Sequence, residues 1–112
     1  MKALSVQVQP GRASEIDIGV LESVFTRLAQ MKHLVLRHQF EHGHDKGEYF
    51  NFTFGTEDLA TLWATIQGVV YGDPALRGPM EVASIASCEG SHGWDDYLLL
   101  YHFDATVKRD AL

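Results

Sequence analysis

The sequence predicts an α+β fold, in which helices pack against an antiparallel sheet. Two kinds of periodicity indicate this class. Apolar and polar residues alternate in some segments, as in half-buried strands, and apolar residues recur every three to four positions in others, as in amphipathic helices. A third observation is a pair of alternating segments around a glycine-flanked turn, which is typical of a β-hairpin. The 112 residues suffice for one domain with a single core.

The first strand and the first helix are expected within the first 30 residues. Residues 2–9 alternate apolar and polar side chains until a Pro-Gly pair stops the strand. The helix is expected over about residues 15–30, with Ser14 as its N-cap and Asp17 in the position of a capping box. Its apolar stripe consists of Ile18, Leu21, Val24, Phe25, Leu28 and Met31.

Residues 34–54 predict the hairpin and a register for it. The apolar side chains of both arms must share one face of the sheet, because a slip by one residue would turn one set toward water. The expected pairs are Phe40 with Phe50, His38 with Phe52, Leu36 with Phe54 and Gly43 with Gly47, which leaves residues 44–46 as the turn.

The remaining elements are a helix and two strands. Thr56 is the expected N-cap of the helix, whose apolar stripe includes Trp63 and which ends at Gly72. Residues 80–88 predict a strand of small side chains, and residues 97–103 predict a last strand that is apolar on both faces. One face of that strand carries Leu98 and Leu100, and the other carries Tyr97, Leu99, Tyr101 and Phe103.

The predicted element order is β-α-β-β-α-β-β. Its first six elements match the split β-α-β, ferredoxin-like plan, with both helices on one face of the sheet and an extra C-terminal strand. We expect residues 1–105 to form this single domain and residues 106–112 to form a charged C-terminal tail. The aromatic face of the last strand is not needed by the helices, so a second subunit, a partner protein or a ligand is expected to cover it, with simple burial as the alternative.

The outline also resembles the dimeric α+β barrel class of proteins. The resemblance rests on residues 8–11 (VQPG) before the first helix, on the hairpin, and on residues 54–56 (FGT) before the second helix. It implies a homodimer whose two sheets face each other around a small-molecule site. Catalytic groups would then come from His38, His102 or the tyrosines, although a fold by itself does not define a function.

The charge is unevenly distributed. The formal net charge is −6, and residues 41–104 hold eleven acids against the two bases Lys46 and Arg77, a formal charge of −9. Nucleic-acid binding requires cations that displace phosphate counterions, so this balance argues against it and favours a basic protein partner. The alternative is that the acids only keep a small surface soluble.

Histidines suggest a metal site at the hairpin tip. His38 and His42 would lie roughly 13 Å apart along a strand and cannot share an ion. His42 and His44 are the candidate ligands, with Asp45 or Glu48 as a helper, because the expected register places Glu48 opposite His42. Zinc sites usually need three or four ligands, so a solvated turn is the competing interpretation.

Other chemistry is poorly supported. Cys88 and His102 would lie roughly 16 Å apart along the last two strands, which argues against a catalytic pair. Nucleotide-binding glycine loops, zinc-finger spacings, calcium loops and nucleophile elbows are absent. Residues 91–96 (SHGWDD) combine polar groups with a tryptophan, which fits a partner-binding loop, an active-site loop or an acidic connection folded on the core edge.

We therefore expect a small acidic binding module of the inhibitor or immunity-protein type, rather than an enzyme, that docks a basic protein or associates with itself. The expected partner or ligand face comprises Trp94, Asp95, Asp96, Tyr97, Tyr101 and Phe103. We expect no cofactor and no nucleic acid. No apolar run reaches the roughly 18 residues of a membrane span. The single Cys88 allows no intrachain disulfide, so a cytoplasmic location is expected.

Overall fold

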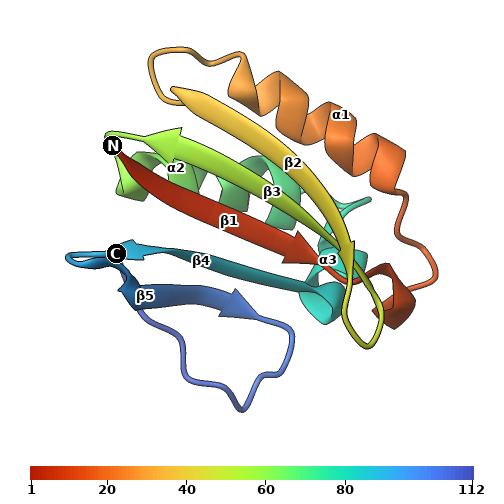
Figure 1. The fold of residues 1–112 in the computed structure, drawn as a ribbon. Helices are drawn as coiled ribbons and strands as arrows, with labels where there is room; N and C mark the ends of the chain where they lie inside the picture. The colour runs from red at the N-terminus through yellow and green to blue at the C-terminus, as the bar shows by residue number, and fades with distance from the viewer.

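The computed structural model describes all 112 residues and consists of one sheet and three α-helices. The strands are β1 (Lys2–Val8), β2 (Arg37–His44), β3 (Glu48–Thr56), β4 (Ser84–Gly90) and β5 (Gly93–His102). The helices are α1 (Ile18–Ala29), α2 (Leu59–Ile66) and α3 (Arg77–Ala83), with a 3₁₀ turn η1 (Pro10–Arg12) and a π-helical turn η2 (Gln67–Tyr71). All strand pairs are antiparallel, in the order β2-β3-β1-β4-β5 (Figure 1). The α+β class is confirmed, whereas the expectation of only two helices is wrong.

The hydrophobic core lies on one face of the sheet. The inward side chains of the central strand β1 are Leu4, Val6 and Val8, and none of them is exposed to solvent. Phe25 of α1 stacks on Phe52 of β3 with ring centroids 4.4 Å apart. Burial of large aromatic side chains contributes the largest hydrophobic term per residue, so this α1–β3 contact anchors the helix layer to the sheet.

The opposite face of the sheet is polar and has no helix over it (Figure 1). Two cross-strand rows define it, because side chains at paired positions point the same way. One row runs Gln39, Thr53, Ser5 and Ser87, and the other runs Glu41, Asn51, Gln7 and Ile85. We call this surface the open face. Polar and apolar residues alternate along these strands because successive side chains point in turn to the open face and to the core.

The predicted hairpin register is wrong by two residues. Phe40 pairs with Phe52, His38 with Phe54 and His42 with Phe50, so the turn consists of residues 45–47. A shift of two residues returns every side chain to the same face, so the burial argument could not distinguish the two registers. The turn decides between them: Lys46 and Gly47 both have positive φ, 58° and 149°, and close a tight connection.

Both predicted helix caps are wrong, although both helices exist. α1 begins at Ile18 because the Asp17 carboxylate accepts a hydrogen bond from the Val20 amide, and the expected cap Ser14 lies outside the helix. α2 begins at Leu59 with Asp58 as its cap. Thr56 ends β3 instead, where its hydroxyl donates to the Leu34 carbonyl at 2.6 Å.

None of the helices is long and apolar enough to cross a membrane.

Residues 80–83 belong to a helix and not to the predicted strand. α3 spans Arg77–Ala83, and β4 starts only at Ser84. Pro79 lies in the first turn of α3, where its missing N–H is tolerated. The junction is held by buried hydroxyls: the Ser84 hydroxyl donates to the Met80 carbonyl, and the Tyr71 hydroxyl lies 2.7 Å from Ser84 Oγ. Burial raises the pKa of Tyr71 well above its usual range.

The last strand does not alternate as predicted. The register shifts between Ala86 and Ser87, so that Ala86 pairs with Tyr101 while Ser87 pairs with Leu99. A bulge of this kind inserts one extra residue, Leu100, and moves Tyr101 to the core side of the sheet. The tail packs along the outer edge of β5, where the Asp110 amide donates to the Leu99 carbonyl and the Leu99 amide donates to the Asp110 carboxylate. The predicted boundary at residue 105 stays a prediction.

We predict that Phe52→Ala lowers the free energy of unfolding by about 3–5 kcal/mol, since it removes a fully buried ring from the α1–β3 contact. Urea denaturation measures the change. Phe40→Ala is the matched control, because Phe40 pairs with Phe52 on the same face but is 36% exposed. Equal losses in the two variants would contradict the anchoring role of the buried Phe52 ring.

Candidate functional site

The strongest candidate site is the segment Trp94 to Tyr97 at the start of β5. Trp94 is 44% exposed and Tyr97 is 55% exposed, although large aromatic side chains are usually buried. Asp95 and Asp96 lie between them, and both are exposed. Trp94 borders a shallow depression on the open face together with Ser5, Ser87 and other polar residues. These four consecutive residues are among the six predicted face residues, and the structure leaves all four exposed.

A hydrogen-bonded turn fixes this segment. The Asp96 carboxylate accepts from the Ser91 hydroxyl at 2.7 Å and from the His92 amide at 2.8 Å, and it lies 3.0 Å from His92 Nδ1. The Ser91 bond, followed by the bond from the His92 amide, lowers the pKa of Asp96. Any side chain at Gly90 would collide with the Asp96 backbone, so Gly90 lets β5 approach β4 closely here.

Ser91, His92 and Asp96 do not form a catalytic triad. In such a triad the two imidazole nitrogens face different partners, one the nucleophile and the other the carboxylate. Here Nδ1 of His92 faces both the Ser91 hydroxyl, at 3.3 Å, and Asp96, and the serine donates directly to the carboxylate. The His92 side chain is 83% exposed. The arrangement orders a surface turn and does not activate a nucleophile.

Further acids lie at the same end of the sheet. The Glu89 carboxylate accepts from the Ala3 amide at 2.8 Å, which ties the end of β4 to the start of β1. Glu57 lies 3.3 Å from the N-terminal amine, just after β3 ends beside Lys2. We call this end, with Glu57, Glu89, Asp95 and Asp96, the acidic end. In Figure 1 it is the left end of the sheet, which also holds the N-terminus and the β4–β5 turn.

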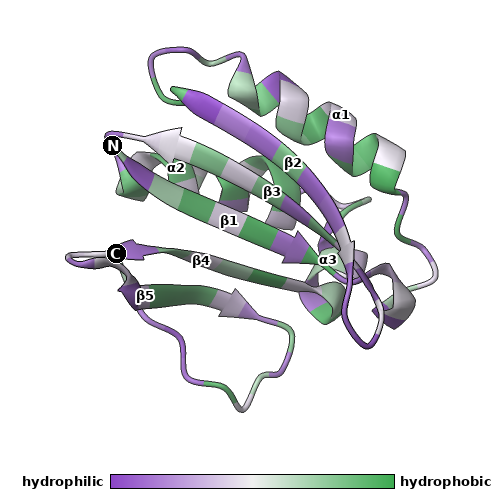
Figure 2. Ribbon diagram, in the orientation of Figure 1, coloured by the Kyte–Doolittle hydropathy of each residue, from purple (hydrophilic) through white to green (hydrophobic).

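Tyr101 and Phe103 are separated from the acidic end. The Tyr101 ring packs 4.9 Å from that of Tyr71, its hydroxyl donates to the Glu81 carbonyl, and the Arg109 guanidinium stacks on it. Burial raises the pKa of Tyr101. Phe103 lies beneath the Arg12 guanidinium, 3.7 Å from the ring centroid. Figure 2 shows the apolar middle of β5 between these two regions.

The hairpin tip does not assemble a metal centre. The structure contains no group of three or more His, Cys, Asp and Glu side chains that could hold a metal ion. His42 stacks on Phe50 with centroids 4.3 Å apart and lies 3.0 Å from Glu48, while His44 pairs with Glu48 in the register. Glu48 therefore approaches His42 as expected, but from the diagonal cross-strand position and not from the directly opposite one. The His42 ring is positioned by its stacking on Phe50.

Cys88 and His102 lie on opposite faces of the sheet. Cys88 is fully buried in the core, whereas His102 pairs with Ile85 on the open-face side. Burial raises the pKa of the Cys88 thiol, which keeps the sulfur protonated and unreactive. These residues do not form a nucleophile and base.

The chain matches no protein-family model, no curated protein and no solved structure.

His38 is the histidine whose environment has a consequence for stability. Its ring stacks on Phe54 at 4.8 Å, and its Nδ1 is buried without a hydrogen-bond partner. Burial lowers the pKa of His38. The unfolded chain, with a histidine pKa of about 6.5, therefore takes up the proton first as the pH falls.

We predict that the free energy of unfolding decreases as the pH falls through about 6.5 and that this His38 contribution levels off below the lowered folded-state pKa. Urea denaturation of wild type and His38→Phe at about pH 7.5 and 5.5 measures it. The variant should lose less stability over this interval, whereas a matched change at the exposed tip, His44→Gln, should behave as wild type. A variant with an undiminished pH dependence would refute the role of His38.

Proposed function

We propose that this protein is a non-enzymatic binding module that docks a basic protein through the acidic end of its sheet. The observation that carries the proposal is the pair of exposed aromatic side chains, Trp94 and Tyr97, with two carboxylates between them. Interface centres are enriched in tyrosine and tryptophan, and a charged rim selects and steers the partner.

The charge distribution supports a cationic partner. Acids from three separate segments converge at the acidic end, around the β3–α2 junction, the end of β4 and the start of β5. The N-terminal amine, Lys2 and Arg37 lie at the same end and offset part of this charge. The attraction for a basic surface therefore comes mainly from Asp95 and Asp96, and it acts over about one Debye length, which is about 8–10 Å at physiological salt. The net charge of −6 on the whole chain also attracts a positively charged partner.

The turn that holds the aromatic pair supports recognition over catalysis. The hydrogen bonds from Ser91 and His92 to Asp96 order the backbone before any partner arrives. Preorganisation of this kind lowers the entropy cost of association. Inhibitor or immunity-type proteins are examples of modules that neutralise a basic partner in this way, and a cytoplasmic location would suit such a role.

We further propose that β1, α1, β2, β3, α2 and β4 are a ferredoxin-like, split β-α-β unit to which α3 and β5 are additions. The element order and the central place of β1 support this proposal. In this plan Trp94, Asp95, Asp96 and Tyr97 belong to the added strand, which would place this part of the recognition surface outside the split β-α-β unit.

We predict that Trp94→Ala and Tyr97→Ala each weaken partner binding by about 2 kcal/mol or more, roughly 30-fold. The partner is to be captured from a cell extract at about 50 mM salt, identified, purified and titrated by calorimetry. The purified partner should carry net positive charge, and raising the salt to about 500 mM should weaken the complex.

Val69→Ala is the matched control, because Val69 is equally exposed, at 43%, but lies in η2 on the helix side. It should bind as wild type. Binding to a neutral or acidic partner, or equal losses in the control and the aromatic variants, would refute the proposal.

Self-association is the second candidate, and the uncovered open face favours it. Two copies facing each other through their sheets would bury Trp94 and the row that ends in Ile85, as in a dimeric α+β barrel with a small-molecule site. This arrangement predicts a dimer mass in light scattering at about 100 µM and a monomer for Thr53→Lys, which places a charge in the middle of the open face. A monomeric wild type at this concentration would eliminate it.

A further inference from the structure

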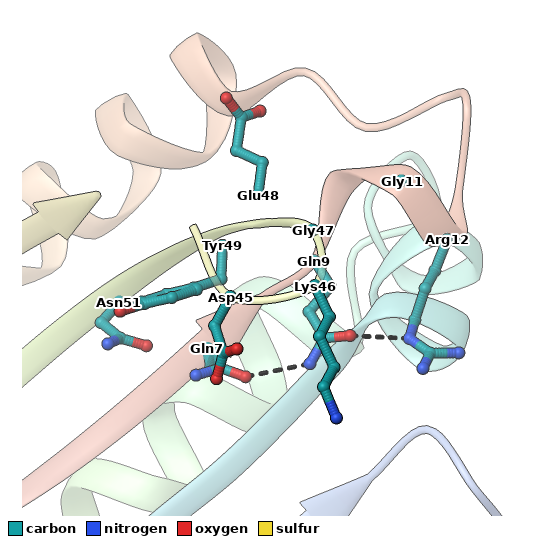
Figure 3. Close-up of a pocket in the computed structure, with 10 residues that line it drawn as sticks. All are labelled: Gln7, Gln9, Gly11, Arg12, Asp45, Lys46, Gly47, Glu48, Tyr49 and Asn51. Carbon is teal, nitrogen blue, oxygen red and sulfur yellow. Dashed lines mark hydrogen bonds between the residues drawn. The ribbon is translucent and has the colours of Figure 1, made fainter. Parts of the chain in front are cut away.

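A hollow of about 580 Å³ lies at the end of the open face opposite the acidic end. It forms where the β2–β3 turn curls over the end of β1 and approaches η1 (Figure 3). Its lining contains a single apolar-type side chain, the ring of Tyr49, which lies across Gly43. A pocket of this size and polarity can hold a small polar molecule.

A chain of hydrogen bonds arranges the donors of this hollow. The Arg12 Nε group donates to Gln9 Oε1 at 2.7 Å, and the Gln9 amide donates to Gln7 Oε1 at 2.9 Å (Figure 3). Both glutamine oxygens are therefore already used as acceptors. The donors that this chain leaves for a ligand are the Gln7 amide nitrogen and the terminal guanidinium nitrogens of Arg12, whose flat face stacks on Phe103.

Two cations face the hollow although the chain as a whole is acidic. Arg12 and Lys46 both line it. Of the two acids in the lining, Glu48 is turned away and contacts His42 at 3.0 Å. The carboxylate of Asp45 remains at the hollow and can accept a hydrogen bond from a hydroxyl or amino group.

Lys46 is held at the hollow by a strained backbone. It is the only residue other than glycine with positive φ, at 58°, in a turn where glycine or asparagine is usual. Such a conformation costs free energy and persists where the surrounding structure enforces it, often at ligand sites.

We propose that this hollow binds a small oxyanion, a carboxylate or phosphate group on a molecule that also carries hydroxyl or amino groups. Arg12 and Lys46 would hold the charged group, with Gln7 as an additional donor, because guanidinium and amide N–H groups match oxyanion geometry. Asp45 and Asn51 would contact the uncharged part of the ligand. The site is independent of the proposed partner surface, which lies at the other end of the sheet.

The test is a titration of the isotope-labelled protein with inorganic phosphate, and separately with citrate, followed by amide chemical shifts at constant ionic strength. Saturable shifts confined to residues 7–12 and 45–51 are expected with at least one probe. The tighter probe identifies the charged group as phosphate or carboxylate. Shifts that do not saturate, or that sodium chloride reproduces, would overturn the proposal.

Two variants and a control test the assigned residues. Arg12→Gln and Lys46→Gly should each raise the dissociation constant at least tenfold, and Lys46→Gly should fold well because glycine adopts φ 58° without strain. Lys108→Gln removes an equal charge in the exposed tail and should change the constant less than twofold. Equal weakening in all three variants would indicate a general charge effect and refute the site.

Discussion

The structure depends on the position of β1 at the centre of the sheet. β1 pairs with β3 on one side and with β4 on the other, and its inward side chains are completely buried beneath the helices. The helices α1 and α2 pack against a single surface, to which β1, the large rings of β3 and the small side chains of β4 all contribute. Close packing of this kind leaves room for few polar groups on the inner face, such as the buried and hydrogen-bonded hydroxyl of Ser84. All polar recognition chemistry is therefore displaced to the open face and to the two ends of the strands.

This displacement separates two kinds of surface. At one end, β4 and β5 present exposed aromatic side chains and acids beside the N-terminus of β1. At the other end, the β2–β3 turn and η1 present two cations and oriented amides beside the C-terminal end of β1. Both ends use the same strand as a rigid support, and neither requires a change in the core.

The sequence predicted those features that depend on local periodicity. The strand character of β1, both arms of the hairpin and the stripe of α1 follow from alternation or helical spacing. Features decided by distant contacts were missed. The hairpin register depends on the turn conformation at Lys46, and the bulge at Leu100 depends on pairing with β4. No pattern indicated that Arg12 would orient Gln9 and Gln7, because the hollow exists only after the hairpin tip folds back over η1.

The C-terminal tail has a consequence for assembly that follows from its hydrogen bonds to Leu99. An antiparallel sheet can grow by adding strands wherever an edge presents unpaired backbone groups. Asp110 occupies these groups at Leu99 of β5, so a strand that is added at this edge would have to displace the tail, whereas β2 forms the opposite edge of the sheet. The tail thereby opposes strand addition at β5 and leaves β2 as the edge at which a further strand would add.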